Sequence, residues 1–271
     1  MAVTRGWLPR GGVVRLATAA LIIGCPNAHS DPGAPDGSGA VPVLRPIVLA
    51  EIPHDPTAYT EGLELDGPNL YESTGIMGQS PSQLRELDPA TGVLRRAAPV
   101  PHGYFGEGIT VVGNRIWQLT YRDGVAVEWD KASLAPVREV ALTGEGWGLC
   151  RDGDRLVRSD GSSRLHYQDP ADFTETGSVS VTRDGTPVNG LNELECVDGQ
   201  VWANVWPSDE IVRIDPATGL VNEVVDATGL LPGPRPRADV LNGIAHFDAQ
   251  EFLLTGKCWP LMFRVHFDPA Q

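Results

Sequence analysis

A short motif occurs five times along the chain: a polar or aromatic residue, then Gly or Glu, then Leu or Ile. The first residues of successive copies are separated by 46, 40, 45 and 50 positions. The copies are Glu61-Gly62-Leu63, Glu107-Gly108-Ile109, Trp147-Gly148-Leu149, Asn192-Glu193-Leu194 and Asn242-Gly243-Ile244. A period of about 40–50 residues is typical of proteins built from stacked units, because one such unit cannot bury its apolar faces alone.

Each copy is followed by the same alternation of apolar stretches and turns. The first turns are Asp66-Gly67, Gly113-Asn114, Asp152-Gly153, Asp198-Gly199 and Asp248-Ala249. Apolar pairs then follow at Leu70-Tyr71, Ile116-Trp117, Leu156-Val157, Val201-Trp202 and Phe252-Leu253. Gly in such turns supplies the positive φ of a tight hairpin. Because four short strands per repeat is the pattern of a propeller blade, we predict an all-β, five-bladed β-propeller over residues 46–271.

Composition agrees with this prediction and excludes other classes. The 271 residues include 31 Gly and 23 Pro, which disfavours a helical bundle because each interior Gly or Pro destabilises a helix. Asp and Glu number 35 against 21 Lys and Arg, a net charge of −14. Nucleic-acid binding requires clustered cations, so we expect no nucleic-acid partner. We expect a soluble monomer.

The first 24 residues are typical of a secretory signal peptide. Arg5, Arg10 and Arg15 precede the apolar run 16–23, and this segment has no acidic residue. The run is shorter than the roughly 20 residues that span a bilayer. We therefore predict an exported protein with a signal peptide at residues 1–24.

Two processing sites are consistent with this signal. The segment Ile22-Ile23-Gly24-Cys25 resembles a bacterial lipobox, in which Cys25 is lipidated and anchors the protein to the membrane. Alternatively, Ala28-His29-Ser30 offers the small residues of a simple cleavage site, which would give a periplasmic or secreted protein. Residues 25–45 are rich in Pro, Gly, Ser and Asp, so we predict a flexible tether there.

Three further cysteines remain. Cys150 and Cys196 lie at nearly matching positions of neighbouring repeats, and disulfides are common in exported proteins, so we predict a disulfide between them. Cys258 is expected to be a buried free thiol. The six His show no ligand spacing and no CxxC or HExxH motif occurs, so we expect no transition-metal centre and no cofactor.

The innermost strand of each propeller blade lines a central channel, so equivalent repeat positions are expected to form rings at its mouth. The first ring contains Glu61, Glu107, Trp147, Asn192 and Asn242. A second set, 13 to 15 residues later in each repeat, contains Thr74, Tyr121, Asp160, Trp206 and Lys257. Carboxyl, amide, aromatic and amine groups in equivalent positions indicate a small-molecule site rather than repeated packing.

Structural roles are the alternative for most of these residues. Trp147 and Trp206 can pack between blades, and Glu61 can be a solvated carboxylate. Asn192 and Asn242 can satisfy strand backbone groups, and Lys257 can pair with Asp160 or a Glu. Glu107 is the strongest candidate, because Gly106 and Gly108 permit close approach by other groups. Aromatic neighbours such as Phe105 are expected to raise its pKa, which suits a general acid or base.

Together the motifs resemble the plant and bacterial glutamine cyclotransferase family. The matching segments include Tyr59-Thr60-Glu61-Gly62-Leu63, Phe105-Gly106-Glu107-Gly108-Ile109, Glu145-Gly146-Trp147-Gly148-Leu149, Ala203-Asn204-Val205-Trp206 and Thr255-Gly256-Lys257. The resemblance covers the chain after residue 46 and implies a five-bladed propeller. It also implies a zinc-independent aminoacyltransferase that cyclises the N-terminal Gln of peptides or proteins to pyroglutamate and releases ammonia.

The resemblance implies roles for the ring residues. Glu107 matches the catalytic glutamate, and Asn192 and Lys257 match polar residues of the site. Tyr59 and Glu61 match its rim, and the walls match Phe105, Tyr121, Trp147 and Trp206. Asp160 joins the substrate-binding set from its place in the second ring.

Three departures from the family pattern concern this site. The family commonly has Phe and Gln where this chain has Tyr59 and Glu61, and Trp where it has Tyr121. The carboxylate of Glu61 is expected either to attract the substrate ammonium or to raise the pKa of Glu107. These departures affect substrate affinity and pH optimum more than reaction type.

The expected mechanism uses Glu107 as a proton shuttle that takes the amine proton and delivers it to the leaving nitrogen. Asn192 and Lys257 would donate to the developing oxyanion. One alternative is a non-catalytic exported propeller that binds peptides or glycans. Another is a propeller lactonase or hydrolase, whose calcium cage of oxygen ligands the mixed rings disfavour.

Overall fold

The computed structural model describes residues 40–233 and 238–270. The predicted signal peptide and Cys25 lie outside these residues. Within them, the regular structure consists of β-strands and one short 3-10 helix, η1 (Pro101–Gly103). No helix in this part of the chain is long and apolar enough to cross a bilayer. The predicted all-β class is confirmed.

Three sheets are simple antiparallel meanders of four consecutive strands, each strand pairing with the next. The first contains β2 (Thr60–Asp66), β3 (Asn69–Thr74), β4 (Gln83–Leu87) and β5 (Leu94–Pro99). The second contains β6 (Gly106–Val112), β7 (Arg115–Thr120), β8 (Val125–Asp130) and β9 (Ala135–Ala141). The third contains β10 (Leu149–Asp152), β11 (Arg155–Ser159), β12 (Arg164–Gln168) and β13 (Glu175–Ser180).

The remaining strands form one larger sheet of order β16-β17-β18-β19-β1-β22-β21-β20. Its C-terminal-half strands are β16 (Leu191–Val197), β17 (Gln200–Val205), β18 (Glu210–Asp215), β19 (Leu220–Asp226), β20 (Leu241–Asp248), β21 (Glu251–Gly256) and β22 (Leu261–Pro269). A small hairpin, β14 (Thr182–Arg183) and β15 (Thr186–Pro187), joins this sheet beside β19.

The N-terminal strand β1 (Val43–Pro53) joins the two halves of this sheet. It pairs antiparallel with β22, for example Glu51 with Phe263, and parallel with β19, where Val43 faces Val224. The two ends of the folded chain therefore share one set of backbone hydrogen bonds. The strand begins three residues before the predicted domain start, so residues 43–45 are strand rather than tether.

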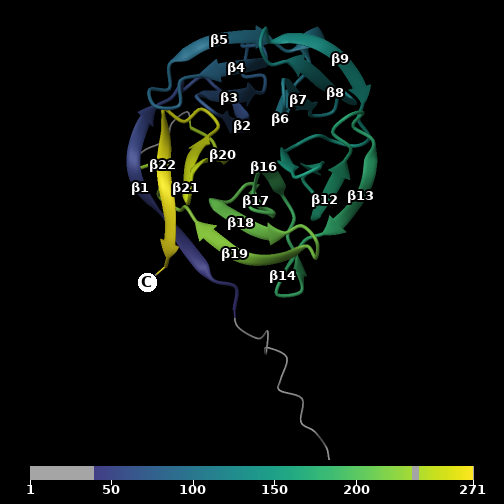
Figure 1. Cartoon of the computed structure of the whole chain (residues 1–271). Coiled ribbons are helices and arrows are strands. Elements are labelled where there is room, and N and C mark those ends of the chain that lie inside the picture. The colour runs from purple at the N-terminus through teal and green to yellow at the C-terminus, as the bar shows by residue number, and fades with distance from the viewer. Residues whose placement is uncertain (1–39, 234–237, 271) are drawn as a thin grey trace, which may run out of the picture. The chain divides into compact units, whose positions relative to one another are not determined.

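The first strands of the repeats meet at the centre of the folded part of the chain. Strands β2, β6, β10, β16 and β20 contact one another in a closed circle, and the other strands lie outside them (Figure 1). The motif glycines explain this close approach. A Cβ on Gly108 would lie 2.6 Å from the main-chain nitrogen of Leu149, and one on Gly148 would lie 2.0 Å from the carbonyl oxygen of Asn192. Any larger residue would push neighbouring first strands apart.

Apolar side chains fill the spaces between neighbouring sheets. One cluster joins Tyr71 and Leu84 of the first meander to Ile109 and Trp129 of the second. Burying such side chains stabilises the fold by about 1.5–3 kcal/mol each. Between the third meander and the larger sheet, the predicted disulfide joins Cys150 of β10 to Cys196 of β16, and Cys258 is a buried free thiol. Packing and the disulfide together hold the first strands in place.

Candidate active site

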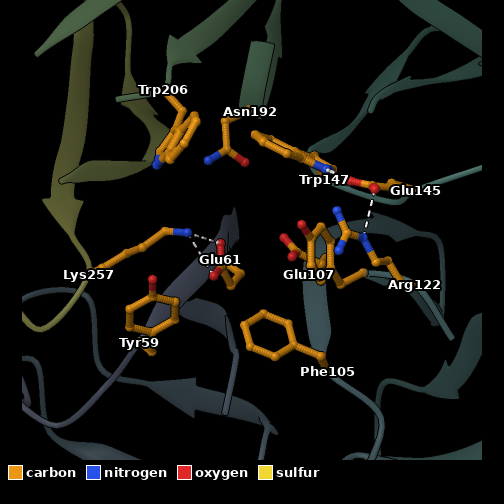
Figure 2. Close-up of a pocket in the computed structure, with 11 residues that line it drawn as sticks. Tyr59, Glu61, Phe105, Glu107, Arg122, Glu145, Trp147, Asn192, Trp206 and Lys257 are labelled. Carbon is orange, nitrogen blue, oxygen red and sulfur yellow. Dashed lines mark hydrogen bonds and ion pairs between the residues drawn. The ribbon is translucent and has the colours of Figure 1, made fainter. Parts of the chain in front are cut away.

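A cavity of about 420 Å³ opens where the first strands begin and the second strands end. Its lining residues are Tyr59, Glu61, Phe105, Glu107, Tyr121, Arg122, Glu145, Trp147, Asn192, Trp206 and Lys257. They come from every repeat and point toward a shared centre (Figure 2). The structure thus brings together nine of the ten residues predicted for the catalytic and substrate-binding sets.

Asp160 is the exception, because its carboxylate is held by residues close to it in the chain. Its Oδ1 accepts hydrogen bonds from the backbone N–H and hydroxyl of Ser162, at 3.0 and 2.6 Å. Its Oδ2 lies 3.0 Å from Nε2 of His166. Burial opposes ionisation, but these hydrogen bonds outweigh it and lower the pKa of Asp160. The carboxylate closes its own turn and does not line the cavity.

Lys257 forms an ion pair with Glu61, one of the two partner types left open by the sequence. Its Nζ lies 2.8 Å from Oε1 and 2.7 Å from Oε2 of Glu61. Asn242 donates from Nδ2 to the same Oε2, at 3.2 Å, and to the carbonyl oxygen of Thr60. Glu61 is therefore a buried, partnered group rather than a solvated carboxylate.

Burial raises the pKa of Glu61, and the ion pair with Lys257 limits the rise to about 7. For Lys257 burial acts in the opposite direction, but the carboxyl groups of Glu61 and Glu107 outweigh it and raise its pKa. The amine is therefore charged at neutral pH. It stabilises the ionised form of Glu61 inside the cavity.

Glu107 lies on β6 and is 5% exposed. It shares a side-chain hydrogen bond with Glu61. Burial raises its pKa well above the usual range, and the adjacent charge of Glu61 raises it further. A hydrogen bond between two carboxyl groups needs a proton on one of them. This hydrogen bond raises the pKa of Glu107 and lowers that of Glu61, so it favours Glu107 as the donor and Glu61 as the acceptor.

Aromatic rings form a continuous wall around these carboxyl groups. Ring centroids are 6.3 Å apart for Tyr59 and Phe105, 5.8 Å for Phe105 and Tyr121, 6.3 Å for Tyr121 and Trp147, and 6.0 Å for Trp147 and Trp206. All five rings line the cavity, in tilted or edge-on contact with their neighbours. Trp147 and Trp206 therefore face the cavity, so packing between sheets is not their main role.

Asn192 supplies an amide between the two indoles (Figure 2). The residue is 2% exposed, and its Oδ1 is buried without a hydrogen-bond partner among the described residues. A buried unpaired amide oxygen costs about 1–3 kcal/mol, so such groups usually have a ligand or water as partner. The side chain is suited to bind a polar group in the cavity.

Arg122 and Glu145 line the cavity but were not predicted. Arg122 donates from Nε to Oε1 of Glu145 at 2.7 Å, and Trp147 donates from Nε1 to Oε2 at 3.0 Å. Glu145 therefore connects the rim to the aromatic wall. Both residues are close in sequence to predicted wall residues, Tyr121 and Trp147, and this proximity could have indicated them. Charged loop residues are usually solvated, however, so they give no distinctive sequence pattern.

Among residues 40–233 and 238–270, no group of three or more His, Cys, Asp or Glu side chains is arranged to hold a metal ion. The cavity offers acid, amide, amine and aromatic groups. These groups can bind a small polar substrate and transfer a proton.

Known proteins share this sequence and architecture. The profile of the glutamine cyclotransferase family matches residues 17–267. The glutaminyl-peptide cyclotransferase of Arabidopsis thaliana is 39% identical over 232 residues, which is 82% of this chain and 71% of that protein. The crystal structure of Myxococcus xanthus glutaminyl cyclase superposes with a TM-score of 0.78 at 36% identity, covering 86% of this chain and all of that one. The chain therefore belongs to the glutamine cyclotransferase family.

Proposed function

We propose that this protein converts the N-terminal Gln of peptides or proteins to pyroglutamate and releases ammonia. Family membership supports the reaction type. The observation that carries the proposal is the contact between Glu107 and Glu61 inside an aromatic cavity, because it places a neutral acid beside an ionisable carboxyl group. These are the groups that this cyclisation requires.

The reaction forms one carbon–nitrogen bond and breaks another. The α-amine attacks the carbonyl carbon of the side-chain carboxamide, and the carboxamide nitrogen leaves as ammonia. The amine must lose a proton, and the leaving nitrogen must gain one. A single acid–base group that reaches both nitrogens can perform both transfers.

Glu107 is that group in this proposal. Because its raised pKa keeps it protonated, it first delivers its proton to the departing nitrogen and then recovers one from the attacking amine. This order is the reverse of the one expected from the sequence, with the same net result. Glu61 keeps Glu107 protonated through its charge. Such proton transfer contributes about 10²–10⁴-fold to rate.

Asn192 and Lys257 have different roles in the proposed mechanism. Lys257 contacts both carboxyl oxygens of Glu61, so its main role is to hold that charge in place. The Asn192 side chain points into the cavity, so its Nδ2–H groups can donate there, while its unpaired Oδ1 can accept a hydrogen bond. We assign donation toward the developing oxyanion chiefly to Asn192.

The aromatic wall holds the Gln side chain in a folded conformation with its amine near its carboxamide. Holding two reacting groups together in this way removes much of the entropic barrier to their reaction. Tyr121 replaces the Trp common in the family, and Arg122 covers its outer face at 4.4 Å from the ring centroid. The smaller ring is thus extended by a flat cation.

For the fold, we propose five blades around a central channel. The three meanders supply three blades. The larger sheet supplies two more blades. One contains β16 to β19, and the other contains β20 to β22 and β1. Strand β1 connects the two blades by pairing with β19. The repeat spacing supports this division, because each proposed blade begins with one copy of the sequence motif.

For localisation, we propose export directed by residues 1–24, with residues 25–42 as a tether to the folded domain. The cationic start and short apolar run support this. Lipidation at Cys25 would hold the protein at a membrane, and cleavage near Ala28 would give a periplasmic or secreted monomer. Mass spectrometry of the mature N-terminus distinguishes the two.

The test of the reaction uses a synthetic peptide with N-terminal Gln, purified protein and EDTA. We expect the peptide to lose the mass of one ammonia, and a matched peptide with N-terminal Asn to remain intact, since its shorter side chain would need a strained ring. Unchanged mass of the Gln peptide, with binding still detected, would support a non-catalytic peptide-binding protein instead. Hydrolysis of a lactone without ammonia release would support the hydrolase alternative.

A further inference from the structure

Arg122 lies on the rim of the cavity, in the turn between β7 and β8, directly after the wall residue Tyr121. Its guanidinium carbon is 4.4 Å from the centroid of the Tyr121 ring, and its Nε–H donates to Glu145. The side chain nevertheless remains 67% exposed. The guanidinium group is therefore held in position by two neighbours while it still faces the mouth of the cavity (Figure 2).

Most of the donors of Arg122 are unused. A guanidinium group carries five N–H donors, and the Nε–H is the one that Glu145 accepts. The two terminal NH₂ groups make no hydrogen bond to the residues that the structure describes. Lys257, the other cation of the cavity, is buried against Glu61. Arg122 is thus the exposed cation at the rim of this cavity, with most of its donors available to a ligand.

The proposed reaction determines which part of a substrate can reach the rim. The amine and carboxamide of the N-terminal Gln react at Glu107, deep in the cavity. The second residue of the peptide is attached through the same α-carbon, and consecutive Cα atoms are 3.8 Å apart. The second residue therefore leaves the cavity across its rim, where Arg122 presents its free donors.

We propose that Arg122 is a specificity-determining residue that donates hydrogen bonds to an oxygen atom of the residue after the N-terminal Gln. This inference rests on the proposed Gln cyclisation. The acceptor is either the main-chain carbonyl or an acidic side chain, since a guanidinium fork suits both. Peptides are thereby better substrates than glutamine amide, which lacks a second residue.

Glu145 opposes any preference for acidic second residues, because its negative charge neutralises the positive charge of Arg122 at the rim. It also accepts the hydrogen bond of the Trp147 indole. Glu145→Gln keeps a carbonyl oxygen for that indole but removes the charge. This variant is expected to increase the ratio of kcat/KM for Gln-Glu amide over Gln-Lys amide. Arg122→Ala is expected to decrease that ratio if an acidic side chain is the acceptor, and to leave it unchanged if the main-chain carbonyl is the acceptor.

The experiment measures ammonia release from glutamine amide, Gln-Ala amide, Gln-Glu amide and Gln-Lys amide. Hydrogen bonds and ion pairs of exposed charged groups are weaker than buried ones, so at this exposed rim we expect Arg122→Ala to lower kcat/KM for Gln-Ala amide about 3- to 10-fold. The loss on glutamine amide should be clearly smaller. Arg95→Ala is the matched control, because Arg95 is also an ion-paired surface Arg, bonded to Asp88, but does not line the cavity.

The substrates separate the two acceptor sources. An equal loss on all three dipeptide amides assigns the main-chain carbonyl, and a larger loss on Gln-Glu amide assigns the side chain. An equal loss on glutamine amide and the dipeptide amides would overturn the role of Arg122. If the unmodified protein cyclises none of these substrates, the proposed function itself fails, which is a distinct result.

Discussion

Two sets of buried carboxyl groups lie on first strands of the repeats but differ in their partners. Glu61 and Glu107 face the cavity, and side chains surround them: Lys257, Asn242 and each other. Glu193 and Glu195 lie one and three residues after Asn192, on β16. Burial raises the pKa of all four.

The second set accepts hydrogen bonds from the backbone of other first strands. Glu193 accepts the N–H groups of Leu63, at 3.2 Å, and Ile244, at 2.8 Å. Glu195 accepts the backbone N–H of His246. These carboxyl groups connect β16 to β2 and β20 and do not line the cavity. A buried carboxyl with a raised pKa therefore indicates chemistry only where its partners are side chains and a ligand can reach it.

The largest expected difference between the two sets concerns Glu107. Glu107→Gln should lower kcat for a Gln peptide about 10²–10⁴-fold, because the amide cannot transfer a proton. The amide resembles the neutral acid in shape, so the midpoint of thermal unfolding should change little. Ammonia release and a thermal melt measure both effects. Near-normal activity in a folded Glu107→Gln variant would place the shuttle elsewhere.

Glu193→Ala should produce the opposite result. The change leaves the N–H groups of Leu63 and Ile244 without their acceptor, and each such loss costs about 1–3 kcal/mol. We expect the free energy of unfolding, measured with denaturant, to fall by about 2–4 kcal/mol in total. Activity of the fraction that remains folded should persist. A variant of normal stability that has lost catalysis would break the distinction between the two sets.

The pH dependence of stability tests whether Glu195 belongs to the structural set of carboxyl groups. Burial, and then the charges of Glu64 and Glu193, raise its pKa in the folded protein. A carboxyl group whose pKa is higher in the folded protein than in the unfolded chain stabilises the fold fully when the pH is below the ordinary glutamate pKa of about 4.3. This stabilisation is lost as the pH rises toward the pKa of the group in the folded protein. Glu195→Gln should therefore flatten the decline of the unfolding midpoint at rising pH. An unchanged slope would show that Glu195 does not titrate in this way.

The smallest expected effect is a shift in the pH profile from Glu61→Gln. Removing the charge of Glu61 lowers the pKa of Glu107, so the alkaline limb of kcat/KM should move to lower pH. The profile should also lose any step near the Glu61 pKa of about 7. Asp160→Asn is the control, because Asp160 lies outside the cavity and should leave the profile in place. Identical profiles for Glu61→Gln and the unmodified protein would show that the charge of Glu61 does not influence the titration of Glu107.

The repeat made most of the cavity predictable from sequence. Equivalent positions on the first strands meet in the circle, which explains why Glu61, Glu107, Trp147 and Asn192 lie together. Equivalence fixes where a backbone lies but not where its side chain points. Asp160 occupies an equivalent position, yet its carboxylate turns to Ser162 and His166.

The sequence pattern could not predict which side chains of different repeats bind each other. Glu61 and Lys257 are 196 residues apart, and several carboxyl groups were equally plausible partners until the fold placed one of them. Arg122 and Glu145 belong to loops, where charge usually means solvent exposure. Strand β1 begins three residues before the predicted domain start at residue 46, because a Pro-rich composition does not reveal that Val43 pairs with β19.

The protonation state of Glu107 tests the central claim most directly. Infrared difference spectra between the unmodified protein and Glu107→Gln, recorded across a pH series, isolate the carbonyl band of the protonated acid. We predict that this band is present at neutral pH and disappears in parallel with the alkaline fall in kcat/KM. A Glu107 that is already ionised at neutral pH, with full activity, would contradict the account.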